Sequence, residues 1–251
     1  MARLQIRGVG VRFGSVAALR DLDLDVPAGT VTGLIGPPHA GKTTAFNVVT
    51  GLQRPTAGTV LLDGADVTAL PPHRRSRLGI ARTFERPEVF GSLTVRENVL
   101  VAAEIRRRWS RDAANTRRVT DEVLAITSLQ PLSRVRCDEL PAGLGQRVAV
   151  ARALATRPGV LLLDEPSAGL DEETGRSLAE LLVRLAATGV AVLLVERNMD
   201  MAVAACETVA LLRSGHVVAR GTPEEVRQHP AFVSAYHSAR AAVAPDTHSL
   251  A

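Results

Sequence analysis

The sequence is poor in lysine and in cysteine. Of its 30 Lys+Arg residues only Lys42 is a lysine, so arginine supplies the positive charge everywhere else along the 251 residues. The two cysteines, Cys137 and Cys206, lie far apart and outside any metal-binding spacing. So few thiols argue against a disulfide framework and are typical of a reduced, cytosolic protein.

Long apolar runs are also missing. No stretch approaches the roughly 18 residues that predict a membrane-spanning helix, and the first ten residues lack the apolar core of a signal peptide. We therefore expect any role at a membrane to come through a partner protein. The net charge is small too, because 26 acidic residues offset the 30 basic ones and leave a formal charge of +4. A dedicated nucleic-acid-binding protein usually carries more, so we expect no nucleic acid partner.

What is present begins with a phosphate-binding pattern. The stretch GPPHAGKTT matches Gly-x-x-x-x-Gly-Lys-[Ser/Thr] at every fixed position, and it contains the single lysine. Backbone N–H groups of such a loop bind a β-phosphate, Lys42 reaches the β- and γ-phosphates, and the Thr43 hydroxyl coordinates Mg²⁺. Arginine is too wide and flat to replace this ammonium, which argues against an ordinary surface turn. The candidate nucleotide-binding residues here are Gly36, Pro37, Pro38, His39, Ala40, Gly41, Lys42, Thr43 and Thr44.

The residues around this loop predict an α/β fold with a largely parallel sheet. Val31–Ile35 reads as a strand entering the loop and Lys42–Leu52 as the helix leaving it. Before them, residues 4–31 alternate as short antiparallel strands, and TVLLDGADV reads as a strand pair with an Asp63-Gly64 turn. From about residue 85 to 158 the pattern is helical, with a capping box at Thr94.

A second motif, a pair of acidic residues, follows the buried run Val160–Leu163. The run ends in Asp164-Glu165, at the edge of a parallel sheet where ligands bind. In an enzyme with a phosphate-binding loop, Asp164 would hold Mg²⁺ and Glu165 would polarise the attacking water. The alternative is a strand that ends in a polar turn, and the loop described above favours the functional interpretation. Further on, Asp171 caps an amphipathic helix, and another buried strand, Val190–Val195, closes with Glu196-Arg197.

The order of these motifs resembles the nucleotide-binding subunit of ATP-binding cassette (ABC) transporters over nearly the whole chain. GPPHAGKTT matches the Walker A loop, VLLLDEP the Walker B strand, and SAGLD, ending at Asp171, the D-loop. Phe13 matches the aromatic residue that stacks on adenine, and core packing is the alternative for it. IARTFERPEVFGSLTVRENVLVA and GTPEEVRQHPAFVSAY resemble the branched-chain amino acid importer branch, of LivG type.

The resemblance implies a P-loop NTPase fold of the RecA-like type. It implies a core over residues 1–84 and 159–221 with an N-terminal antiparallel β subdomain, a helical subdomain over 85–158 and a tail over 222–251. It also implies that two subunits enclose two ATP molecules with Mg²⁺, each site pairing one subunit's Walker motifs with the other's signature helix. The signature residues are Leu140, Pro141, Ala142 and Gly143.

The partners implied are a second ABC ATPase subunit, which we expect to be a different chain, and transmembrane permease subunits. An extracytoplasmic solute-binding protein would be an indirect partner. The place implied is the cytoplasmic face of the inner (plasma) membrane, as a peripheral subunit. Branched-chain amino acids as the solute rest on resemblance alone, and urea or another amide is the alternative.

Four residues depart from the family pattern near the γ-phosphate. Pro141 stands where the signature has serine, and His39 where the Walker loop has glycine, which costs on the order of 1 kcal/mol if its φ is positive. Glu85 replaces the Q-loop glutamine and can still ligate Mg²⁺. Arg197 replaces the switch histidine and can donate to phosphate. We expect Glu85 and Arg197 to pair across the empty site, with independent drift as the alternative.

Two functions therefore stay open. The first is an ATP-hydrolysing importer subunit, which intact Lys42, Thr43, Asp164, Glu165 and Asp171 support. The second is a nucleotide-binding, hydrolysis-poor subunit that completes the site of a catalytic partner, which the departures support. We favour residual hydrolysis because the base Glu165 is present. An ABC ATPase acting on DNA or ribosomes is disfavoured by the single cassette and the low charge.

Overall fold

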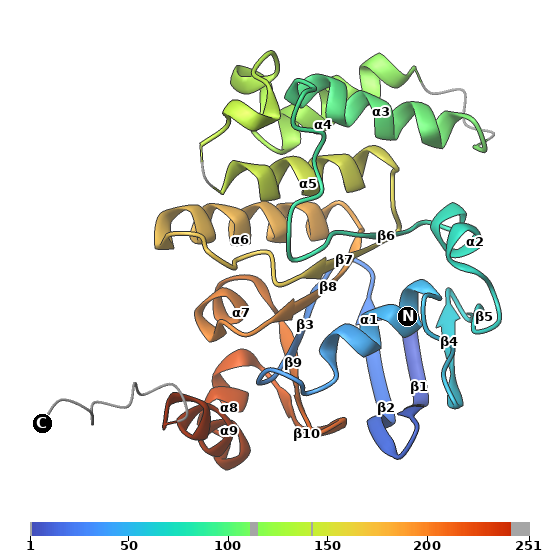
Figure 1. Cartoon of the computed structure of the whole chain (residues 1–251), viewed down its shortest axis with the longest axis vertical. Coiled ribbons are helices and arrows are strands. Elements are labelled where there is room, and N and C mark those ends of the chain that lie inside the picture. The colour runs from blue at the N-terminus through green and yellow to red at the C-terminus, as the bar shows by residue number, and fades with distance from the viewer. Residues whose placement is uncertain (1, 111–114, 142, 242–251) are drawn as a thin grey trace, which may run out of the picture.

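The computed structural model describes residues 2–110, 115–141 and 143–241. Two sheets and the helices packed around them make up this part of the chain (Figure 1). The strands are β1 (Ala2–Phe13), β2 (Val16–Pro27), β3 (Val31–Ile35), β4 (Ala57–Leu62), β5 (Ala65–Asp66), β6 (Ile80–Arg82), β7 (Val160–Asp164), β8 (Ala191–Glu196), β9 (Thr208–Arg213) and β10 (His216–Gly221).

Helices pack against both faces of the larger sheet. They are α1 (Lys42–Thr50), α2 (Pro72–Arg77), α3 (Val95–Arg107), α4 (Thr116–Ile126), α5 (Leu144–Ala155), α6 (Glu172–Ala187), α7 (Met199–Ala205), α8 (Pro223–Gln228) and α9 (Pro230–Ala241), with short 3-10 turns at Gln130–Leu132 and Cys137–Glu139. None of them, within the described residues, is long and apolar enough to cross a membrane.

The larger sheet has six strands in the order β10-β9-β3-β8-β7-β6, all parallel except the edge strand β10. Its central strands β3, β7 and β8 are buried along their whole length. Residues Leu161 and Leu163 face the core under the helices, while Val160 and Leu162 face the core shared with the smaller sheet. Burial on both faces explains why these strands read as continuous apolar runs.

The smaller sheet is antiparallel, in the order β2-β1-β4-β5. Residues 2–27 form two strands of 12 residues each rather than the several short strands expected, and they are paired with register shifts that mark bulges. Bulges bend a long strand, which is why the alternation in the sequence breaks into short stretches. The turn between β4 and β5 has positive φ at Asp63 and Gly64, as a tight hairpin turn requires.

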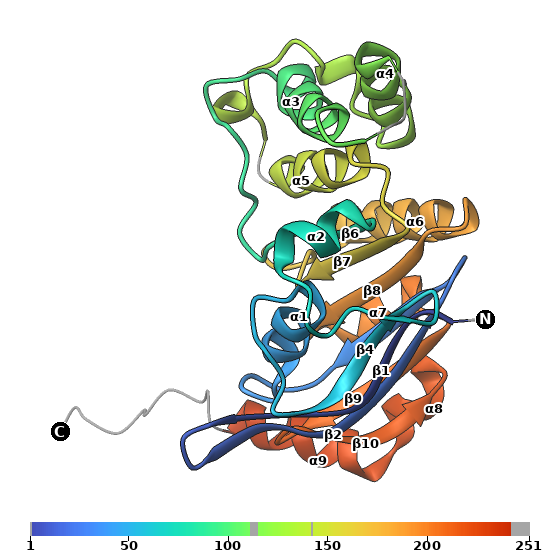
Figure 2. The same cartoon turned by 90° about the vertical axis from the view of Figure 1, so that its right-hand side faces the viewer.

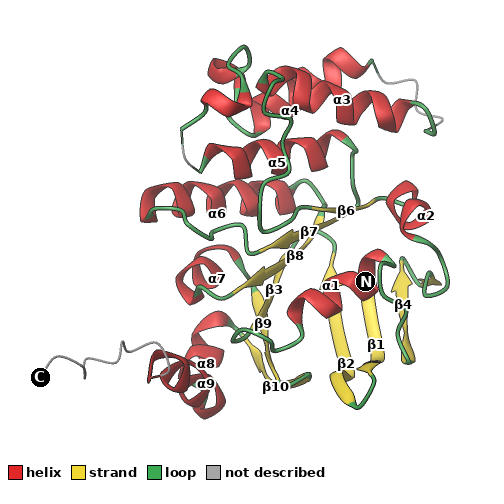
Figure 3. Cartoon of the chain, in the orientation of Figure 1, coloured by secondary structure: helices red, strands yellow, loops and turns green. Residues whose placement is uncertain are grey.

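The helices α3, α4 and α5 form a layer of their own at one end of the molecule, beyond α6 (Figures 1 and 2). Helix α3 begins at the predicted capping box, where Thr94 and Glu97 each accept from the other's backbone N–H. Helices α8 and α9 lie at the opposite end, beside β9 and β10 (Figure 3). The fold class expected from the sequence, a P-loop NTPase sheet with added antiparallel and helical parts, is confirmed.

Candidate functional site

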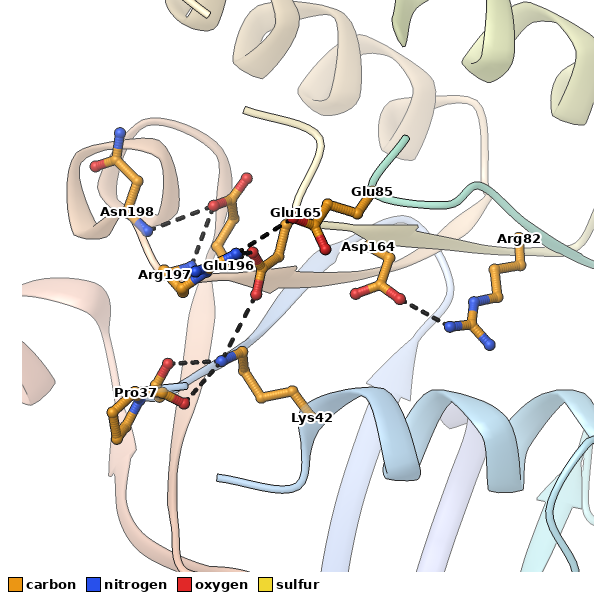
Figure 4. A network of polar contacts seen from close by, with 10 residues as sticks. Pro37, Lys42, Arg82, Glu85, Asp164, Glu165, Glu196, Arg197 and Asn198 are labelled. Carbon is orange, nitrogen blue, oxygen red and sulfur yellow. Dashed lines mark hydrogen bonds and ion pairs between the residues drawn. The ribbon is translucent and has the colours of Figure 1, made fainter. Parts of the chain in front are cut away.

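The phosphate-binding loop lies between β3 and α1 and is folded around its own lysine. The Lys42 ammonium is buried and donates to the carbonyl oxygens of Gly36 at 2.7 Å and Pro37 at 3.0 Å (Figure 4). Glu165 Oε1 lies 3.7 Å from the same Nζ. Burial lowers the pKa of Lys42, and the nearby Glu165 carboxylate opposes that effect. These carbonyl oxygens are neutral acceptors, and an anionic phosphate is a stronger one. A buried ammonium held in this way can therefore exchange the carbonyl oxygens for a bound phosphate.

Two glycines of the loop are required by close contacts. A Cβ at Gly36 would lie 2.2 Å from the Leu212 carbonyl oxygen, and one at Gly41 would lie 2.6 Å from the Ala18 carbonyl oxygen. His39 takes φ +62°, so the positive φ on which the expected cost depends is present. A non-glycine residue pays roughly 1 kcal/mol for this conformation. His39 is exposed at the loop surface.

One cavity of about 570 Å³ collects most of the predicted site residues from separate segments of the chain. It is lined by Phe13, Ala18, Pro38, His39, Ala40, Gly41, Lys42, Thr43, Thr44, Glu85, Glu165 and Arg197. Phe13 is 52% exposed at its edge, so the core-packing alternative for this residue is wrong. A flat aromatic ring beside a phosphate-binding loop is what a purine base needs for stacking.

The Walker B acids stand at the end of β7. Asp164 is 6% exposed, and Glu165 takes φ +46° as the chain leaves the strand. Arg82 Nη2 donates to Asp164 Oδ2 at 2.7 Å, so a buried ion pair holds this carboxylate (Figure 4). Arg82 could not be predicted from the sequence, because a single arginine in an arginine-rich chain carries no pattern of its own.

Arg197 joins the two acids of the γ-phosphate end. Its guanidinium forms an ion pair and hydrogen bond with Glu165, and its Nη2 lies 3.4 Å from Glu85 Oε1. The hydrogen bond that Arg197 donates to Glu165, followed by the negative charges of Glu165, Glu85 and Glu196, raises the pKa of Arg197. The expected contact with Glu85 is confirmed, and the closer partner, Glu165, was not anticipated. Glu165, the proposed base, is therefore already paired with Arg197, the residue at the switch position.

A buried carboxylate lies behind this pair and was also missed. Glu196 is 2% exposed and accepts backbone N–H groups from Ser167 at 3.0 Å, Arg197 at 3.2 Å and Asn198 at 3.4 Å. Burial raises the pKa of Glu196, while these hydrogen bonds oppose the rise. A buried acid at the end of an apolar strand was the available signal, and it was read only as the end of the strand.

The C-terminal helix reaches the same region. Tyr236 of α9 stacks on Phe232 with ring centroids 4.3 Å apart, and burial raises the pKa of its phenol to about 12. The backbone of Gly36 and the charge of Glu196 are close enough to influence that pKa as well. The segment recognised in the sequence only as importer-like thus packs behind the phosphate-binding loop.

The signature segment lies away from the cavity. Leu140, Pro141 and Gly143 line a separate hollow, which they share with Glu85 and residues 168–170 of the D-loop. Ala142, the remaining predicted signature residue, lies outside the described residues. Asp171 caps α6 by accepting from the Thr174 N–H at 2.8 Å. One chain therefore does not bring its signature to its own phosphate-binding loop, and the roles of these residues stay predictions.

The donors near the loop fit a magnesium nucleotide. Thr43 is exposed at the start of α1, and Asp164 lies at the end of β7 within the influence of Lys42. No group of three His, Cys, Asp or Glu residues among the described ones forms a metal site by itself. Mg²⁺ needs no such cage, because it is commonly held by one or two protein oxygens together with substrate phosphates and water.

Comparison with known proteins agrees with this geometry. Residues 19–168 match the family model described as ABC transporter. The chain is 34% identical to the high-affinity branched-chain amino acid transport ATP-binding protein BraF of Pseudomonas aeruginosa, over 93% of this chain and 96% of that protein.

Solved structures of cassettes share the fold. The ADP conformation of MJ1267, an ATP-binding cassette of an ABC transporter, superposes with a TM-score of 0.85 at 27% identity, covering 94% of this chain and 99% of that one. The dimeric structure of MJ0796, a bacterial ABC transporter cassette, gives 0.75 at 27% identity, covering 88% and 98%. The chain belongs to the ABC transporter family, as an ATP-binding subunit whose hydrolysis of ATP is coupled to transport.

Proposed function

We propose that this chain is the ATP-binding and hydrolysing subunit of an importer for amino acids, with branched-chain amino acids as the solute. The observation that carries the proposal is the similarity to BraF over 93% of the chain, which extends well beyond residues 19–168 of the matched family model. The cavity beside the phosphate-binding loop supports ATP as the nucleotide, because its lining combines an aromatic ring, Phe13, with a cation, Lys42.

In the proposed reaction the residues of the chain divide the work. The loop N–H groups and Lys42 bind the phosphates, Thr43 and Asp164 hold Mg²⁺ with Glu85 as a further oxygen donor, and Glu165 polarises the attacking water. Mg²⁺, when bound, neutralises charge that develops on the phosphate oxygens. Arg197 has to leave Glu165 before that carboxylate can act as a base. In its new position the guanidinium can donate to the γ-phosphate.

The proposed partners follow from what one chain leaves incomplete. A second ABC ATPase subunit, a different chain, would present its signature helix to this phosphate-binding loop, and the Leu140–Gly143 segment with Asp171 would act on the partner's ATP. We place the complex at the cytoplasmic face of the inner membrane, with an extracytoplasmic solute-binding protein acting indirectly.

A cleft beside the nucleotide site supports a permease partner. It measures about 340 Å³ and opens between the larger sheet and the helical layer of residues 85–158. We propose that this layer is a subdomain inserted between the two parts of the core, residues 1–84 and 159–221. Residues 222–251 then form a C-terminal tail. Exposed apolar side chains border it, namely Leu52 and Phe84. An apolar cleft of this kind fits an amphipathic helix of a partner.

A second candidate function is a subunit that binds nucleotide but hydrolyses it poorly. The contact of Arg197 with both Glu165 and Glu85 favours it, because the base is paired with a cation before any nucleotide binds. Pro141 favours it for the partner's site, since proline offers neither a hydroxyl nor an N–H to phosphate.

Steady-state ATP turnover of the purified chain, alone and with the second ATPase subunit and permease in liposomes, tests the proposal. We expect turnover that rises on assembly and labelled leucine that enters only with ATP. Turnover that stays at the level of a Glu165→Gln chain in the full assembly would establish the second candidate. ATP-driven uptake of urea without leucine would contradict the assigned solute.

A further inference from the structure

Arg82 connects three parts of the molecule through one guanidinium group. Its side chain ends β6 and is 7% exposed. Nη2 donates to Asp164 Oδ2 at 2.7 Å, and Nη1 donates to Asn47 Oδ1 at 2.7 Å. Asn47 belongs to α1, the helix that follows the phosphate-binding loop. The two ends of the fork thus tie the Walker B carboxylate to the helix of the loop. Figure 4 shows the end that contacts Asp164.

The same guanidinium also contacts two aromatic rings. Its central carbon lies 5.4 Å from the ring centroid of Phe46 and 5.0 Å from that of Phe84. Phe46 is fully buried in α1, whereas Phe84 is 41% exposed. Both Phe84 and Arg82 line the cleft of about 340 Å³. A side chain that enters the cleft would therefore meet Phe84, which lies directly on the group that holds Asp164.

Only arginine can make this set of contacts. A buried carboxylate requires a partner, and a planar fork satisfies Asp164 and Asn47 at once while its face remains available for aromatic contact. Lysine would retain the charge but reach one of the two oxygens. Arg82 occupies Oδ2 of Asp164, which fixes the orientation of the carboxylate and leaves the other oxygen for a metal ion.

We propose that Arg82 is a positioning residue that sets the Asp164 carboxylate for Mg²⁺ and passes displacement of Phe84 in the cleft on to that carboxylate. The part concerning Asp164 depends only on ATP hydrolysis by this family. The part concerning the cleft rests on the proposed permease partner, but both parts are testable in this chain together with the second ATPase subunit and without the permease, so their failure is distinct from a failure of permease binding.

The first test replaces Arg82 with methionine, which keeps the length of the side chain and removes the fork. We expect kcat for ATP to fall about tenfold through misplacement of the metal carboxylate, with KM for ATP changed by less than about twofold. Binding of Mn²⁺ in place of Mg²⁺, measured by electron paramagnetic resonance with a non-hydrolysable ATP analogue, should be as tight as in the wild type or tighter, because a cation next to Asp164 has been removed.

The outcomes separate positioning from simple support of the fold. Unchanged kcat in Arg82→Met, or loss of Mn²⁺ binding in parallel with kcat, overturns the proposal. Arg82→Lys should recover part of the lost kcat, and it decides the matter by the same readouts if Arg82→Met does not fold. Arg7→Met is the matched control, because it removes an Arg–Asp pair in the smaller sheet, where Arg7 contacts Asp25 at 2.5 Å. Its kcat should equal that of the wild type.

The second test concerns the connection to the cleft. Phe84→Leu keeps an apolar side chain but removes the ring under the guanidinium, and we expect kcat to fall about threefold without weaker Mn²⁺ binding. In the Arg82→Met background the same substitution should have no further effect, because Phe84 acts through Arg82. Effects on kcat that multiply independently, or no effect of Phe84→Leu alone, overturn this connection.

Discussion

The two ends of the nucleotide site are prepared in different ways. At the loop end the contacts are made with backbone atoms. Lys42 is buried against carbonyl oxygens, and the backbone of Leu212 and Ala18 leaves room only for glycine at positions 36 and 41. At the γ-phosphate end exchangeable side chains meet, with Arg197 46% and Glu85 59% exposed around the more buried Glu165. The loop end therefore tolerates little change, whereas the γ-phosphate end can be altered without loss of the fold.

This difference separates binding from hydrolysis. Of the four departures from the family pattern, Glu85 and Arg197 lie beside Glu165, Pro141 lies on the signature that serves a partner, and His39 is an exposed residue of the loop. Pairing of Arg197 with Glu165 gives the nucleotide-free site an internal counter-ion in place of phosphate. We expect ATP to displace that contact, and we expect this to make the closing step, rather than initial binding, less favourable.

The largest effects should separate the two ends most clearly. Lys42→Ala removes the compact cation that compensates phosphate charge, and we expect ATP affinity to fall at least about a hundredfold. Glu165→Gln should keep ATP affinity and lower kcat by about 10² or more, because only the polarising base is lost, and it should trap the closed dimer. Calorimetric titration and size-exclusion chromatography with ATP measure these results. Wild-type turnover in Glu165→Gln would show that another group is the base.

Adenine binding offers a test that does not depend on Glu165. Phe13→Ala should weaken ATP binding by about 1–3 kcal/mol, the usual contribution of one aromatic ring stacked on a base. Because Phe13 is about half exposed, the melting temperature of the nucleotide-free chain should stay within about 1 °C of the wild type. Unchanged ATP affinity would assign the ring another role.

The two ends of the nucleotide site also differ in how much of them could be predicted from the sequence. The loop, its strand and its helix follow from local pattern, and α1 ends two residues earlier than expected, at Thr50. Asp164 and the cap at Asp171 were predicted because they stand at element ends. The contacts of Arg82, Glu196 and Tyr236 join segments far apart in the chain, and no periodicity records such pairings. The division of the chain into subdomains stays a prediction.

A smaller effect should come from the contact between Glu85 and Arg197. Their side chains are both about half exposed at 3.4 Å, so solvent limits the pair to at most about 1 kcal/mol. A double-mutant cycle of Glu85→Gln and Arg197→His, followed by ATP turnover, should give a coupling free energy above about 0.5 kcal/mol. Arg197→His also removes the contact between Arg197 and Glu165. The cycle is therefore repeated in the Glu165→Gln background, with ATP affinity as the readout, so that the coupling measured there belongs to Glu85 and Arg197 alone. Additive effects in both backgrounds would favour independent drift.

The smallest effect concerns the dependence of stability on pH at Glu196. Its pKa is raised by burial, so the folded state holds the proton more tightly than the unfolded state, where the ordinary value is 4.5. The contribution of Glu196 to the free energy of unfolding is then complete below pH 4.5 and is lost as pH rises through the raised pKa.

Glu196→Gln replaces this group by an amide that does not titrate, and we expect the variant to lose less stability than the wild type between pH 4.5 and 7.5. For a chain of this size about 1 kcal/mol corresponds to about 2–4 °C in melting temperature, which scanning calorimetry resolves. Glu207→Gln, at an exposed position, is the matched control and should follow the wild type. If the three backbone N–H donors stabilise the carboxylate more than burial destabilises it, the sign reverses and the variant loses more stability than the wild type. That result would mean that the donors from Ser167, Arg197 and Asn198 keep Glu196 ionised. The D-loop and the switch residue would then be held together by a charged group rather than a neutral one.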